Sequence, residues 1–95
     1  MSNDFRKPVR VRAGQDCLFK PGESGPLWRV VEGTARLDRD NGPVRLPVLL
    51  ALPGDLVGVE ALCDQPYQFS AGAFTDCRFE RVPVAGEMER QALLR

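Results

Sequence analysis

The stretch CLFKPGESGPLWRVVEGTARL, residues 17–37, alternates short apolar runs with residues that form turns. Pro21-Gly22 precedes the run 27–32, and Gly33 separates that run from 34–39. Glycine permits the positive φ that a tight reversal of the chain requires. The pattern therefore predicts two paired strands that meet near Gly33, with Trp28 and Val30 on the buried face of the first strand.

The second of these strands, residues 34–39, has its own alternation of apolar and charged residues. Ala35 and Leu37 are separated by two positions, and so are Arg36 and Asp38. Because side chains alternate between the two faces of a strand, we expect Ala35 and Leu37 to point inward and the two charged residues to point outward.

On both sides of this stretch, proline and glycine continue to separate short apolar runs. Further strands are predicted over residues 9–12, 17–19, 44–52, 69–74 and 77–82. Pro47 lies inside the longest of them, which predicts an edge strand or a bulge there. Short strands at this spacing are typical of an all-β sandwich or barrel.

The pattern changes near the C-terminus. From Ala85 to Arg95 there is no proline and helix-forming residues dominate. Met88, Ala92 and Leu93 fall on one face of such a helix. We therefore predict a β domain over residues 1–84, followed at 85–95 by the start of a helix whose apolar face needs a partner.

The chain has 95 residues, which is the size of one small domain. Thirteen basic and thirteen acidic residues balance each other, which argues against a freestanding nucleic-acid-binding protein. The longest apolar run, Val48–Leu52, is too short to span a membrane, and the N-terminus lacks the pattern of a signal peptide. A cytoplasmic protein without membrane contact is therefore expected.

The sequence contains no histidine. This excludes imidazole metal ligands, histidine acid–base catalysis and Ser-His or Cys-His nucleophile pairs, so we do not expect an enzyme. The three cysteines, Cys17, Cys63 and Cys77, are widely spaced and odd in number, which does not indicate a disulfide framework. We expect buried and inert thiols, and Cys63 is the first to test for reactivity.

Three segments together carry a resemblance to a known family. They are CLFKPGESGPLWRVVEGTARL (17–37), LPGDLVGVEAL (52–62) and FSAGAFTDCRFERVP (69–83). In this order and spacing they resemble the N-terminal sensory domain of Crp/Fnr transcription regulators, over about residues 8–95. The resemblance implies a mainly β fold: a double-stranded β-helix or jelly-roll-like β-roll of the cyclic-nucleotide-binding type, with short helices and the start of a C-terminal dimerisation helix.

In that family the roll is followed by a long dimerisation helix and a helix-turn-helix domain that binds DNA. The 95 residues contain only the start of the long helix. The chain is therefore expected to be either a piece of a longer regulator or a natural single-domain protein, and the sequence leaves both open.

The resemblance also implies a ligand pocket. In cyclic-nucleotide binders of the family, a glutamate after a glycine holds the ribose, and an arginine before a Ser-Ala pair neutralises the phosphate. Gly58 matches the glycine, but Val59 and Phe69 occupy the two charged positions, and Glu60 comes one residue late. A buried phosphate without a cation is unfavourable, so we predict weak or no binding of cyclic AMP. The candidate pocket residues are Gly58, Val59, Glu60, Ala61, Leu62, Phe69, Ser70 and Ala71.

Two interpretations of this pocket remain. The small residues 71–73 leave room for a different and less polar ligand. The favoured interpretation is that Val59, Leu62 and Phe69 fill the former pocket and stabilise the roll. No cofactor is expected, because three scattered cysteines do not match the iron–sulfur branch of the family and its haem sensors need a histidine.

The resemblance thus predicts a sensory domain of a Crp/Fnr-like regulator. It implies a small molecule as a candidate effector, a homodimer in the intact regulator, and DNA contact only through a domain that these residues do not contain. The alternative is a ligand-free β-roll that serves as an interaction or dimerisation module. A cupin-type enzyme is disfavoured because such enzymes hold their metal with histidines.

Overall fold

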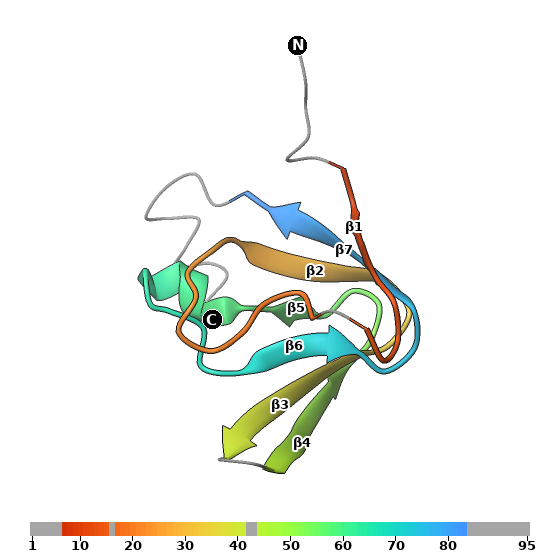
Figure 1. Ribbon diagram of the computed structural model, residues 1–95. Coiled ribbons are helices and arrows are strands. Elements are labelled where there is room, and N and C mark those ends of the chain that lie inside the picture. The colour runs from red at the N-terminus through yellow and green to blue at the C-terminus, as the bar shows by residue number, and fades with distance from the viewer. Residues whose placement is uncertain (1–6, 16, 42–43, 84–95) are drawn as a thin grey trace.

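The computed structural model describes residues 7–15, 17–41 and 44–83, which form two antiparallel sheets (Figure 1). In order across the four-stranded sheet lie β1 (Val9–Val11), β7 (Cys77–Val82), β2 (Leu27–Glu32) and β5 (Leu56–Val57). The three-stranded sheet contains β4 (Val44–Ala51), β3 (Ala35–Asn41) and β6 (Ser70–Ala73). A short 3₁₀ helix, η2 (Val59–Cys63), follows β5. The predicted mainly β roll is therefore confirmed.

The predicted pairing across Gly33 is wrong. β2 pairs with β5 and β7, whereas β3 pairs with β4 and β6, so Gly33 carries the chain from one sheet to the other. Its φ is 84°, and any side chain there would collide with the backbone carbonyl of Asp76. A hairpin and a crossing between sheets both use such a glycine, which is why the local sequence did not distinguish them.

Most strand ranges agree with the sequence pattern, and β2 and β7 begin and end at the predicted residues. The predicted strand 17–19 is wrong, since only Phe19 forms an isolated bridge, with Ala71. Pro47 lies in an edge strand, as predicted. The pairing also shifts from Leu37 with Leu49 to Asp38 with Pro47, so the predicted bulge is present too.

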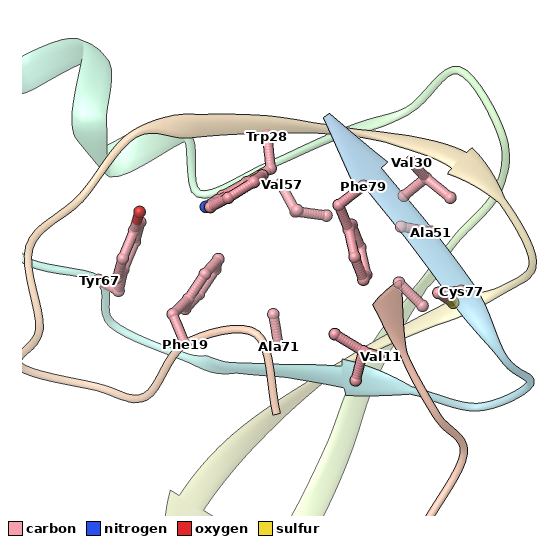
Figure 2. Close-up of a cluster of buried hydrophobic side chains, with 11 residues drawn as sticks. Val11, Phe19, Trp28, Val30, Ala51, Val57, Tyr67, Ala71, Cys77 and Phe79 are labelled. Atoms are coloured by element: carbon pink, nitrogen blue, oxygen red, sulfur yellow. The ribbon is translucent and has the colours of Figure 1, made fainter. Parts of the chain in front are cut away.

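The hydrophobic core lies between the two sheets (Figure 2). Trp28 and Val30 of β2 are buried, as predicted, and they belong to one cluster with Phe79 of the neighbouring strand β7 and Ala35 of the other sheet. The cluster comprises Val11, Phe19, Trp28, Val30, Ala35, Ala51, Val57, Tyr67, Ala71, Cys77 and Phe79. These residues come from both sheets. One of them, Val57, is the last residue of β5, so the core holds the start of the turn where the candidate pocket begins.

Asp38 contradicts the predicted alternation, because its side chain is buried with 3% relative exposure. The carboxylate is held by Arg36, whose Nε donates a hydrogen bond to Oδ2 at 3.0 Å and lies 2.9 Å from Oδ1. The contact with Oδ1 is an ion pair without the alignment of a hydrogen bond. A charged side chain can be buried when it is paired with an opposite charge. The alternation of apolar and charged residues does not show such a pair, so it predicted an exposed Asp38.

The predicted helix over 85–95, with Met88, Ala92 and Leu93, lies outside the described residues. Within the part of the chain that the structure describes, no helix is both long enough and apolar enough to cross a membrane.

Candidate ligand pocket

A cavity of about 430 Å³ opens between η2 and the inner faces of β3 and β4. Its size lies in the range of small-molecule sites, which is about 300–1,000 Å³. Apolar side chains dominate the wall, and among the described lining residues Glu60 is the only charged one. The lining residues are Phe19, Leu37, Leu49, Leu56, Val57, Gly58, Val59, Glu60, Gln68 and Phe69.

Half of the eight sequence-derived candidates line this cavity. These are Gly58, Val59, Glu60 and Phe69. The other four, Ala61, Leu62, Ser70 and Ala71, lie outside the lining, and the last three of them are buried in the roll. The four candidates that line the cavity lie directly after β5, at residues 58–60, and directly before β6, at Phe69.

Sequence reasoning missed the wall that β3, β4 and the 17–19 segment contribute. Leu37 and Leu49 are direct partners across β3 and β4, so both project from the same face of the sheet. The inward alternation of the 34–39 strand already predicted the direction of Leu37. The contribution of Phe19 and Leu49 depends on contacts between distant segments, and no local pattern gives them.

The cavity is open, so the interpretation that Val59, Leu62 and Phe69 fill it is wrong. Val59 is 49% exposed, and Leu62 is buried outside the lining. Phe69 is partly buried and lines the cavity without closing it. The guanidinium carbon of Arg39 lies 5.8 Å from the centroid of the Phe69 ring, which is within the range of a cation–π contact.

Gly58 shapes the inner end of the pocket. Its φ is 78°, in the left-handed region, and a Cβ atom there would lie 2.9 Å from Cε1 of Tyr67 and 3.3 Å from Cε2 of Phe19. The turn after β5 can therefore approach this aromatic pair only because the residue is glycine.

Glu60 in η2 accepts hydrogen bonds from the segment that precedes β6. Its Oε2 accepts a hydrogen bond of 2.7 Å from the backbone N–H of Gln68, and its backbone carbonyl accepts one from Gln65. Among the described residues, no partner approaches the other carboxylate oxygen, Oε1. The side chain thus has a structural role, and Oε1 accepts no hydrogen bond from the described residues.

The cysteines differ from the expectation that all three are buried. Cys77 is buried, but Cys17 is partly exposed and Cys63 is exposed. Burial, with a smaller contribution from Asp76, raises the pKa of the Cys77 thiol. Cys63 is the last residue of η2, in which Leu62 is the buried residue. Across the described residues, no cluster of three or more cysteine or acidic side chains could hold a metal ion.

These elements define the class of the fold as a cyclic-nucleotide-binding-like β-roll with an apolar pocket. The chain is 39% identical over 82 residues to the transcriptional regulator SdrP of Thermus thermophilus, a match that covers 82% of this chain and 40% of that protein. No family model matches the chain.

Solved structures agree with this similarity. The crystal structure of a CRP/FNR-family transcriptional regulator from Thermus thermophilus superposes with a TM-score of 0.76 and 33% identity, and the match covers 90% of this chain and 46% of that chain. An EAL enzyme in its cGMP-bound form superposes with a TM-score of 0.72 over 94% of this chain and 23% of that chain. At 23% identity, this second likeness shows the fold alone.

The resemblance inferred from the sequence is thus confirmed: the chain is similar in sequence to a transcriptional regulator and in fold to a CRP/FNR-family transcriptional regulator. The match covers 40% of the curated regulator and 46% of the chain in the regulator crystal structure, so this chain spans less than half the length of each.

Proposed function

We propose that this chain is the sensory domain of a Crp/Fnr-like transcription regulator whose pocket does not bind cyclic nucleotides. The similarity to transcriptional regulators in sequence and in fold supports the regulatory role. In this proposal an effector in the pocket biases the intact, homodimeric regulator in the cytoplasm, and a separate domain contacts DNA.

The observation that carries the proposal is the position of Val59 and Phe69. Both line the cavity, at the places where the resemblance implies the ribose-binding glutamate and the phosphate-binding arginine. The charged group that remains in the lining, Glu60, is negative and repels a phosphate. Arg39 lies over the ring of Phe69 but does not line the cavity, so it does not replace the lost cation.

Calorimetric titration of the folded chain with cyclic AMP and cyclic GMP tests this proposal. We expect no saturable heat signal at micromolar nucleotide, because a desolvated phosphate without a cationic partner is unfavourable. Circular dichroism of the same sample should show the β spectrum of a folded roll. Micromolar affinity for either nucleotide would overturn the proposal.

A second candidate function is a ligand-free interaction module. The observation that favours it is a set of exposed apolar side chains outside the cavity lining: Leu50, Leu52 and Phe74. Exposed apolar groups of this kind can mark a protein interface. Native mass spectrometry separates the two functions, since a sensory domain is expected to retain a co-purifying small molecule and a bare module is not.

A further inference from the structure

We infer that the pocket binds a small and largely apolar molecule that has no negative charge and carries a hydrogen-bond donor. This inference rests on the proposed function and names the ligand class of that site. It follows from the charge of the lining, the free acceptor on Glu60 and the fixed aromatic wall.

The lining discriminates by charge. Seven of its ten residues have aliphatic or aromatic side chains, and no Lys or Arg occurs among the lining residues that the structure describes. An anionic ligand would lose its hydration and face the carboxylate of Glu60 without compensation. A neutral, apolar ligand loses little hydration and gains contact with the wall.

Of the two polar side chains that line the cavity, Glu60 favours a donor on the ligand, whereas the carboxamide of Gln68 can donate as well as accept. Glu60 uses Oε2 to accept the hydrogen bond from the Gln68 N–H, which fixes the orientation of the carboxylate. Oε1 is left with its acceptor capacity, and an ionised carboxylate offers no proton to a ligand acceptor. A ligand with an N–H or O–H group can therefore pair with Glu60, whereas a ligand that only accepts cannot.

The cavity has a fixed inner wall and an apolar rim. Phe19 is buried and stacks on Tyr67 with ring centroids 3.7 Å apart, so it is held in place before any ligand arrives. Val59 and Leu49 line the cavity and are 49% and 57% exposed, so a ligand that covers them removes apolar surface from water. A preformed wall lowers the entropic cost of binding.

The test uses phenylnaphthylamine, a neutral aromatic probe with one N–H donor whose fluorescence rises in apolar surroundings. We expect saturable binding to the full chain. The anionic analogue anilinonaphthalene sulfonate should bind at least about tenfold more weakly, because its charge faces Glu60. The N-methylated analogue, which lacks the donor, should bind about two- to tenfold more weakly than the parent probe.

Two neighbouring leucines provide a matched pair of variants. Leu49 lines the cavity and pairs with Leu37, whereas Leu50 pairs with Arg36 on the opposite face of the sheet. Both are exposed, so a charge should be tolerated in the fold at either position. Leu49→Glu should weaken binding of the neutral probe at least about tenfold, and Leu50→Glu should leave it within about twofold.

Absence of saturable binding by the neutral probe, tighter binding of the sulfonate, or equal effects of the two variants would overturn the inference. Loss of self-association in Leu49→Glu without probe binding to the parent chain would show a protein interface instead, and also overturns it. The nucleotide titration is separate: if cyclic AMP and the neutral probe both fail to bind, only the ligand class is wrong. Micromolar binding of cyclic AMP contradicts the proposed function itself.

Discussion

The ring of Phe19 stacks on the ring of Tyr67, with centroids 3.7 Å apart and planes inclined by 13°. Phe19 forms part of the pocket wall, and the hydroxyl of Tyr67 donates a hydrogen bond of 2.5 Å to the carbonyl of Pro26. The pair therefore joins the pocket to the loop before β2 (Figure 2). The wall of the cavity depends on Tyr67, although Tyr67 does not line it.

Replacing Tyr67 by Phe removes this hydrogen bond and keeps the stacked ring. We expect the free energy of unfolding to fall by about 1–2 kcal/mol, because the Pro26 carbonyl loses its donor while the packing remains. Urea unfolding measures the change. Phe74→Leu at an exposed position serves as the control and should change the free energy by less than about 0.5 kcal/mol. An unchanged Tyr67→Phe variant would show that the hydrogen bond contributes nothing.

Alkaline pH should destabilise the parent chain through the same residue. Burial raises the pKa of Tyr67 above its ordinary value of 10.0, although the indole of Trp28 opposes the rise. The folded state therefore holds the phenolic proton at pH values where the unfolded chain has released it. The contribution of Tyr67 is complete below about pH 10 and is lost as pH rises through the folded-state pKa.

The measurement for this pH effect is the free energy of unfolding between about pH 9 and 11, compared between the parent and Tyr67→Phe. The difference between the two proteins should shrink as pH rises, since the variant has no phenol to ionise. A constant difference across this range would mean that Tyr67 titrates alike in both states.

Gly58→Ala tests the turn that brings the pocket against the aromatic pair. The new methyl group meets Tyr67 at 2.9 Å and also adopts a φ of 78°. Gly54→Ala is the matched control, because Gly54 has a φ of 97° but no atom within 4 Å of the added carbon. The backbone strain alone costs about 1–2 kcal/mol in either variant. Thermal unfolding should show a larger loss for Gly58→Ala, and equal losses would argue against the aromatic contact.

The sequence predicted where the strands lie along the chain better than it predicted which strands pair with each other. β2 and β7 were found because their buried residues recur at alternate positions, as Trp28 and Val30 show. The sheet to which each strand belongs depends on pairings between distant segments, so Gly33 was assigned to a hairpin. The buried Asp38 was missed for a related reason, since its pairing with Arg36 offsets part of the cost of burying a carboxylate.

For the candidate site, the resemblance identified the two segments that contribute to the pocket, and the structure showed the cavity that they line. It led to Gly58, Val59 and Phe69, which line the cavity. It did not indicate whether the apolar replacements fill the space, because the outcome depends on the direction of each side chain. Val59 lines the cavity and is half exposed, so it does not fill the space.

The thiols should differ in reactivity with a disulfide reagent at pH 8. Cys63 is exposed and should react fast, whereas Cys77 is buried, has a raised pKa and donates to the Thr75 carbonyl at 3.1 Å. A thiol with a raised pKa supplies less of the reactive thiolate. Reagent kinetics followed by mass spectrometry should show Cys63 labelled at least about tenfold faster than Cys77. Comparable rates would indicate that the core opens readily around Cys77.

Restoring both missing charges should create affinity for cyclic AMP. Val59→Glu and Phe69→Arg place a carboxylate and a guanidinium in a cavity that is already of suitable size, and they supply the partners that a ribose and a phosphate need. We therefore expect the double variant to bind cyclic AMP at least about tenfold more tightly than either single variant, by calorimetry. Circular dichroism checks that the variants fold. A folded double variant with no affinity would mean that features of the cavity other than Val59 and Phe69 prevent nucleotide binding.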